Sequence, residues 1–161
     1  MIRIINLIFF IIYFSANNAH SLIEIDITRG NLDPLPIAVS PLFQDDGSKK
    51  NSIDEIKIEN VGSEISSVVE NNLKTSGLFN PLNKEAFLQK PDIAHLKPRF
   101  EDWALIKAQA LITGKVTIEN KKLKVEFRLW DILAGREMMA LAFTTVPSNW
   151  RRVGHIISDK V

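Results

Sequence analysis

Beyond residue 21, the side chains with catalytic or metal-binding potential are two of the three histidines of the sequence and three pairs of neighbouring carboxylates. His95 lies in a stretch flanked by prolines, and His155 lies on the polar side of a predicted helix near the end of the chain. The carboxylate pairs are Asp45-Asp46, Asp54-Glu55 and Glu101-Asp102. Paired carboxylates could act as general acid and base, and histidines with carboxylates could hold a divalent metal.

The spacing of these residues does not favour such a site. The sequence has no cysteine, no HxxxH spacing and no clustered Asp motif, which excludes disulfides and thiolate chemistry and disfavours a metal site. The seven glycines form no GxGxxG or Walker pattern, and no serine lies in GxSxG or SxxK spacing. The carboxylate pairs fall in predicted loops or helix starts, where charge normally reflects solvation or the helix dipole. We therefore expect no catalytic site, no cofactor and no metal, and a protein that is not an enzyme.

The elements that would position any site begin with an apolar leader. Arg3 precedes a largely apolar run over residues 4–14, and small and polar residues follow over 15–21. This order is that of a secretory signal peptide, and a run of about eleven residues is too short for a transmembrane helix, which needs roughly 20. We expect residues 1–21 to be a signal peptide cleaved near Ala19 to Ser21, with no membrane insertion afterwards. An uncleaved membrane anchor is the alternative.

The net charge of the exported chain limits the classes of partner that it could bind. The sequence has 20 Lys and Arg residues against 19 Asp and Glu residues, and residues 1–21 contain one basic residue and no acidic one. The remaining chain is therefore neutral, which disfavours nucleic acid and anionic membranes because both call for a clear basic excess. About 140 residues suffice for one domain with its own core.

Hydrophobic periodicity predicts an α+β domain, a mixed α/β fold, over residues 22–161. Apolar and polar residues alternate over Leu22–Thr28, and the apolar run Ile37–Phe43 suits an interior strand. Three longer alternating strands follow, joined by turns at Asn120-Lys121 and Ala134-Gly135, and predict an antiparallel meander. We expect a mixed sheet of about five strands.

Two main helices are expected to pack on this sheet. The first spans Val61–Ser76 and ends at Gly77 in the left-handed conformation. The second spans Ser148–Val161, with Ser148 as its cap. The segments between these elements are Lys49–Asn60, which fits a helix start or a short strand, helical turns over 83–90 and 101–107, and a loop over 91–98.

Two tryptophans in polar surroundings are candidates for partner contacts. Trp130 shares a predicted strand face with Glu126 and Arg128. Its ring either lies under a helix or at the end of the sheet, or is an exposed anchor for a partner protein. Trp150 is expected in the core. The two arginines that follow it oppose the helix dipole, which suggests ion pairs with acids of this or a neighbouring domain.

The strand that export would leave at the new amino terminus is the strongest candidate binding site. An unpaired strand offers a row of backbone N–H and C=O groups to which another sheet can add. Pairing with a strand of its own domain is the competing possibility. The candidate protein-binding residues are Leu22, Ile23, Glu24, Ile25, Asp26, Ile27, Thr28 and Arg29.

Five segments along the chain together resemble one known family. In order they are Ile25–Gly30 with Pro36–Val39, Ser76–Leu82, Ala110–Val116, Val125–Asp131, and Asn149–Arg152 with His155–Asp159. Each segment is short, but their order across nearly the whole exported chain resembles the TolB family of the Tol-Pal envelope system.

The resemblance implies a periplasmic, non-catalytic adaptor. It implies an N-terminal α/β domain followed by a six-bladed β-propeller, of which we expect only the first here, with the propeller absent. In the family the mature N-terminal segment binds the C-terminal domain of the inner-membrane protein TolA, which places that contact on Leu22 to about Asp33. The propeller contacts the lipoprotein Pal, so we expect this chain to lack most of the Pal surface.

The family also implies a cellular role. The Tol-Pal system supports outer-membrane integrity and envelope constriction during cell division, and we expect this chain to serve it by adding its terminal strand to TolA. The alternative is a small periplasmic ligand-binding or hydrolytic domain. That alternative would need a deep pocket that holds convergent carboxylates or His155.

Overall fold

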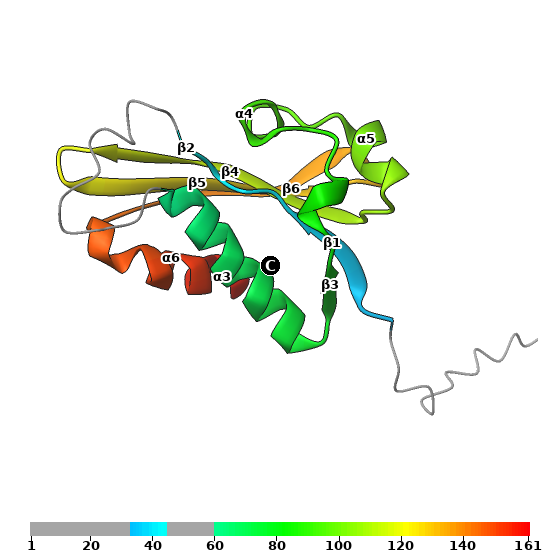
Figure 1. The fold of residues 1–161 in the computed structure, drawn as a ribbon, viewed down its shortest axis with the longest axis horizontal. Coiled ribbons are helices and arrows are strands. Elements are labelled where there is room, and N and C mark those ends of the chain that lie inside the picture. The colour runs from blue at the N-terminus through cyan, green and yellow to red at the C-terminus, as the bar shows by residue number, and fades with distance from the viewer. Residues whose placement is uncertain (1–32, 45–59) are drawn as a thin grey trace, which may run out of the picture. The chain divides into compact units, whose positions relative to one another are not determined.

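The computed structural model of the 161-residue chain describes residues 33–44 and 60–161. Within these residues the fold is α+β, with one mixed sheet and helices on both of its faces (Figure 1). The predicted fold class is therefore confirmed. The predicted leader 1–21, the predicted strand Leu22–Thr28 and nearly all of Lys49–Asn60 lie outside the described residues.

The sheet has six strands in the described part of the chain, where the sequence predicted about five. Their order is β3-β1-β4-β5-β6, and a short β2 also pairs with β4. The strands are β1 (Leu35–Val39), β2 (Phe43–Gln44), β3 (Phe79–Pro81), β4 (Ala110–Glu119), β5 (Lys122–Asp131) and β6 (Arg136–Thr145). β1 runs parallel to β3 and β4, whereas β4, β5 and β6 form the predicted antiparallel meander.

The first hairpin of the meander turns where the sequence predicts. Asn120 and Lys121 have φ angles of 50° and 60°. Two successive left-handed residues make the tight turn whose twist matches that of the flanking strands. β4 and β5 therefore stay in register over their full ten-residue lengths.

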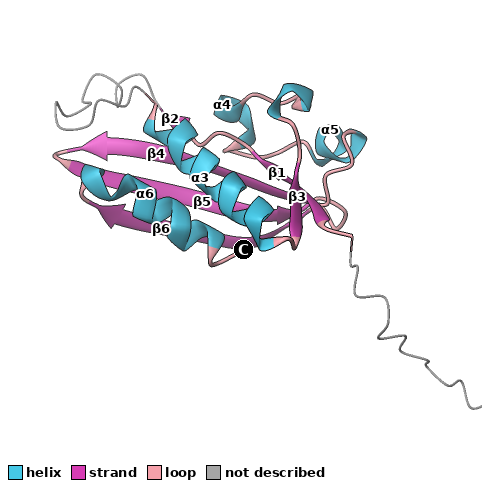
Figure 2. Ribbon diagram, turned by 60° about the horizontal axis from the view of Figure 1, so that its bottom comes forward, coloured by secondary structure: helices cyan, strands magenta, loops and turns pink. Residues whose placement is uncertain are grey.

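The helices divide between the two faces of the sheet. The longer ones, α3 (Val61–Ser76) and α6 (Trp150–Ser158), lie side by side on one face, as Figure 2 shows. The short α4 (Pro91–Ala94) and α5 (Phe100–Leu105) lie on the other face. Gly77 ends α3 with φ 73°, and its N–H donates to Lys74 O at 3.2 Å, which confirms the predicted end of the helix.

Each face has its own hydrophobic core. The larger core lies between the sheet and the pair α3 and α6. Its members include Ile65 and Val69 of α3, Ile157 of α6 and Phe127 of β5. The smaller core contains Trp103 of α5, which is buried beside Leu111, Trp130 and Ile132.

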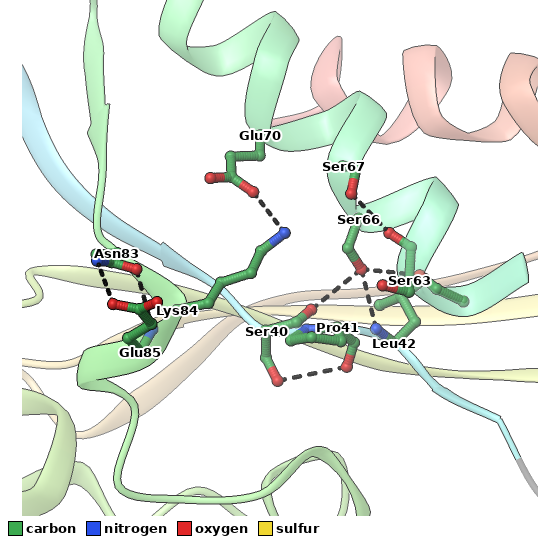
Figure 3. A network of polar contacts seen from close by, with 11 residues as sticks. Ser40, Pro41, Leu42, Ser63, Ser66, Ser67, Glu70, Asn83, Lys84 and Glu85 are labelled. Carbon is green, nitrogen blue, oxygen red and sulfur yellow. Dashed lines mark hydrogen bonds and ion pairs between the residues drawn. The ribbon is translucent and has the colours of Figure 1, made fainter. Parts of the chain in front are cut away.

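The apolar run Ile37–Phe43, predicted as one strand, is broken into β1 and β2. Pro41 has no N–H to donate to a sheet. The N–H of Leu42 instead donates to Ser66 Oγ of α3 at 2.9 Å, and that hydroxyl lies 2.9 Å from Gly62 O and 3.2 Å from Ser40 O (Figure 3). A helix side chain thus satisfies the backbone groups that a continuous strand would have paired, which explains the additional strand.

Helix boundaries also differ from the prediction. The last helix begins at Trp150 after a 3-10 turn over Pro147–Asn149, so Ser148 is not its cap, and it ends at Ser158. Residues 91–98, predicted as a loop, contain α4, because Pro91 occupies the first turn, where its missing N–H costs nothing.

Candidate functional site

The predicted binding strand Leu22–Arg29 lies outside the described residues, but its attachment to the domain is described. Asp33 and Pro34 are exposed, and β1 follows directly. Leu35 N–H donates to Leu78 O at 2.9 Å, and Gln109 N–H donates to Pro36 O at 2.9 Å. Because β1 lies between β3 and β4, the segment is joined to a strand that is hydrogen-bonded on both sides.

The two histidines lie on different faces of the sheet and have separate structural contacts. His95 follows α4; its ring stacks on Phe43 with centroids 4.6 Å apart, and its Nδ1 lies 3.0 Å from Pro91 O. His155 of α6 lies 2.8 Å from the side-chain amide of Asn72 on α3. Within residues 33–44 and 60–161 no three His, Asp or Glu side chains gather in a way that could hold a metal.

The predicted carboxylate pairs do not form a catalytic arrangement in the described residues. Asp45-Asp46 and Asp54-Glu55 lie outside them. Asp102 accepts from Arg99 Nε at 2.7 Å and is paired with the same guanidinium, while Glu101 is exposed. The third pair therefore lies in the first turn of α5, as the sequence predicts.

A groove of about 390 Å³ crosses β4, β5 and β6 on the face that carries α4. Among the described residues, Glu126 is its one carboxylate, and it pairs with Lys124 at 3.0 Å. Arg128 pairs with Glu137 at 3.1 Å and donates to His95 O at 3.0 Å. His155 lines a different hollow, so the groove lacks the convergent carboxylates or the histidine that a hydrolytic site would require.

The tryptophans are structural in the described part of the chain. Trp130 is 8% exposed, its ring meets Phe100 of α5 edge-on, and its Nε1 donates to Thr113 Oγ1 at 2.9 Å. Of the two possibilities for Trp130, the ring covered by a helix is correct and the exposed anchor is wrong. Trp150 packs against the larger core, as expected.

The arginines after Trp150 do not make the predicted ion pairs within the described residues. The guanidinium of Arg151 instead lies 4.9 Å from the centroid of the Trp150 ring, a cation–π contact. This contact explains how a cation is held in the first turn of a helix, where the dipole disfavours it.

The buried polar residues that hold the elements together, among them Ser66 and Gln89, were not identified from the sequence. Ser66 joins α3 to the break between β1 and β2. Gln89 is 4% exposed, and its Oε1 accepts from Arg99 N–H and from Trp103 Nε1, both at 2.9 Å. Ser66 lies on the apolar face of its helix, and this position could have indicated that its hydroxyl is buried. Nothing in the sequence indicates that Gln89 is buried.

No helix in the described ranges is long and apolar enough to cross a membrane. A family model described as the TolB amino-terminal domain matches residues 23–138. The chain belongs to the TolB amino-terminal domain family. Over all 161 residues this TolB domain is 69% identical to the Tol-Pal system protein TolB of Pelagibacter ubique (strain HTCC1062), and it spans 35% of the length of that relative. The family resemblance carried by the five sequence segments is thus confirmed.

Solved structures share the fold of this TolB domain. TolB from Acinetobacter baumannii matches with a TM-score of 0.60 and 20% identity, over 80% of this chain and 27% of that one. The lipoprotein GNA1162 from Neisseria meningitidis matches with a TM-score of 0.51 and 18% identity, over 78% of this chain and 93% of that one. At these identities the likeness concerns the fold alone.

Proposed function

We propose that this TolB domain is a non-catalytic periplasmic adaptor of the Tol-Pal system that binds the C-terminal domain of TolA. The observation that carries the proposal is its 69% identity, over the whole chain, to a Tol-Pal system protein TolB. On this proposal residues 1–21 are a cleaved signal peptide, and the segment from Leu22 to about Asp33 makes the contact. The system in turn supports outer-membrane integrity and constriction during division.

The proposed mechanism is strand addition. The backbone of Leu22–Arg29 pairs with the edge of a TolA sheet, and Ile23, Ile25 and Ile27 set the register by burying one face. Each backbone hydrogen bond contributes about 0.5–1.5 kcal/mol net, so several of them with apolar burial suit a reversible link of about micromolar Kd.

The attachment of the segment supports this use. The segment leads into β1, which is hydrogen-bonded to β3 on one side and to β4 on the other. A partner that pulls on the segment therefore pulls on an interior strand of the sheet rather than on an outer one. The rest of the described surface favours no catalytic alternative, because its groove holds one carboxylate.

Contact with Pal is assigned to the propeller of the family, outside this chain. We therefore expect the chain to bind TolA with little binding to Pal.

Deletion of Leu22–Arg29 from the exported protein tests the proposal. We expect binding to the TolA C-terminal domain, measured by calorimetric titration, to be lost, while the far-UV spectrum and the melting temperature stay nearly unchanged. A matched control keeps the eight residues but reorders them so that the isoleucines no longer alternate; it should also fail to bind. Undiminished binding after the deletion would refute the assignment, and a large loss of stability would place the strand in the sheet of its own domain.

A further inference from the structure

β6 is the long open edge of the described sheet. Its ten residues pair with β5 alone among the described strands, and none of them is buried. The outer strand at the other side, β3, has three residues and ends at Pro81, which has no N–H to offer. The edge at β3 therefore offers only a short run of backbone groups, whereas the edge at β6 offers a long one.

The middle of β6 lacks the features that normally protect an edge. Its charged residues are the first two, Arg136 and Glu137, and the eight residues from Met138 to Thr145 carry no charge. Native edge strands are usually blocked by charges, prolines or bulges along their length. β6 has a register irregularity opposite Leu129 and Trp130, at its charged end, so its uncharged part is regular.

The side chains at the centre of β6 follow the same order of sizes in both chain directions. Met139-Ala140-Leu141-Ala142-Phe143 runs large, small, large, small, large. Met139, Leu141 and Phe143 lie opposite Leu129, Phe127 and Val125, which belong to the core under α3 and α6. Directly opposite residues share a face. The large residues therefore lie on the face that carries α3 and α6, and the alanines lie on the face that carries α4. Leu141 is nevertheless 38% exposed.

We propose that β6 is a self-association surface that pairs antiparallel with β6 of a second copy of this chain, with Leu141 on the two-fold axis. In this register Leu141 meets Leu141, Met139 meets Phe143, and Ala140 meets Ala142. A shift by one residue would bring the large residues of one copy to the wrong face. A shift by two keeps the faces but sets Met139 opposite Thr145 or Phe143 opposite Glu137, so only the proposed register pairs all the large residues with one another.

The charges next to the alanines fit the same arrangement. Arg128 lies opposite Ala140 on β5, and Glu126 lies opposite Ala142. Across the proposed axis, Arg128 of one copy and Glu126 of the other are separated by two alanines, over three strand spacings of about 14 Å in total. Both side chains are roughly half exposed, at 42% and 46%, and each already pairs within its own chain, Arg128 with Glu137 and Glu126 with Lys124. Opposite signs in the same row therefore avoid repulsion across the axis rather than form a new ion pair.

The proposed interface is small. Stable complexes bury about 1,200–2,000 Å² in total, which one pair of strands with its flanking side chains does not reach easily. We therefore expect a reversible dimer whose population rises with protein concentration. The surface lies on a different strand from the proposed TolA segment, so the two proposals stand or fall separately.

The absence of cysteine from the chain allows a direct test with the exported full chain. Paired residues in an antiparallel ladder have Cα atoms about 4.5–5.5 Å apart, which suits a disulfide. We expect Leu141→Cys to form a covalent dimer on mild oxidation. Met139→Cys is the register control, because its symmetry mate lies four residues away, about 14 Å. Met139→Cys should not cross-link to itself but should cross-link when mixed with Phe143→Cys.

Sedimentation equilibrium supplies a second test that needs no cross-link. The unaltered chain should show a monomer–dimer equilibrium, and Leu141→Lys, which puts two cations on the axis, should remain a monomer. Leu105→Lys changes an equally apolar residue, 74% exposed on α5, and should dimerise normally. A chain that stays monomeric and fails to cross-link through Leu141→Cys overturns the proposal. So does a Met139→Cys variant that cross-links as fast as Leu141→Cys, because random collision would then explain both.

Discussion

Ser66 Oγ on α3 accepts a hydrogen bond from Leu42 N–H, with 2.9 Å between nitrogen and oxygen. The serine is 1% exposed, and the same hydroxyl lies within hydrogen-bond distance of Ser40 O. The two backbone groups belong to the residues that separate β1 from β2. The helix thus satisfies buried backbone where the chain leaves the sheet.

Ser66→Ala should therefore destabilise the domain. The substitution leaves the buried N–H of Leu42 without an acceptor, and an unsatisfied buried donor costs about 1–3 kcal/mol. The free energy of unfolding from urea titration measures this cost. Ser67→Ala is the matched control, because Ser67 is exposed and its hydroxyl bonds only to Ser63 O of the preceding turn. Equal losses for the two variants would contradict the role given to Ser66.

The same contact shows why part of the fold was predictable from the sequence and part was not. The meander was predicted because its alternation and its Asn120-Lys121 turn are local patterns. The break between β1 and β2 depends on a side chain 24 residues further along the chain than Leu42, so the apolar run alone read as one strand.

Gln89 fixes the segment before α5 through its amide oxygen, which accepts from Trp103 Nε1 and Arg99 N–H. Gln89→Met keeps the length of the side chain but removes both acceptor contacts. We expect a loss of about 2–4 kcal/mol in unfolding free energy, since two donors lose their partner. Gln109→Met, at an exposed position, should change stability by less than about 0.5 kcal/mol. A neutral Gln89→Met variant would show that water replaces the amide at no cost.

The candidate site shows a similar division. The family could be recognised from segments spread along the chain, because sequence similarity does not depend on where side chains point. The burial of Trp130 could not be predicted from the sequence. The alternation that puts Trp130 beside Arg128 does not reveal that α5 brings Phe100 against its ring. The binding strand itself stays a prediction, because residues 22–29 lie outside the described ranges.

Gly154 of α6 lies where α6 meets α3. A Cβ at this position would come within 2.8 Å of Val68 Cγ1 and 3.3 Å of Ile65 O. Gly154→Ala gains up to about 1 kcal/mol in helix propensity, but overpacking typically costs about 1–3 kcal/mol. We therefore expect a net loss of about 1 kcal/mol in unfolding free energy.

A double-mutant cycle with Val68→Ala checks that the cost arises from this contact. Val68→Ala removes Cγ1, which the new Cβ would meet at 2.8 Å, and keeps Cβ, at 2.9 Å. Gly154→Ala should therefore cost less in that background than in the unaltered chain, without becoming neutral. Strictly additive losses would show that α6 moves away from α3 without contact between these residues.

Ile25→Asp tests the proposed strand addition at single-residue level. Ile25 is the middle of the three isoleucines that would be buried against TolA, and burial of such a side chain contributes about 1.5–3 kcal/mol. Replacement by aspartate should therefore weaken TolA binding by about 10-fold to 150-fold, as measured by calorimetric titration. Asp26→Asn, on the opposite face of the same strand, should change the affinity by less than about 3-fold, because exposed charges contribute little. If the asparagine variant binds as weakly as Ile25→Asp, the apolar face does not make the contact, and charge rather than strand register drives the interaction.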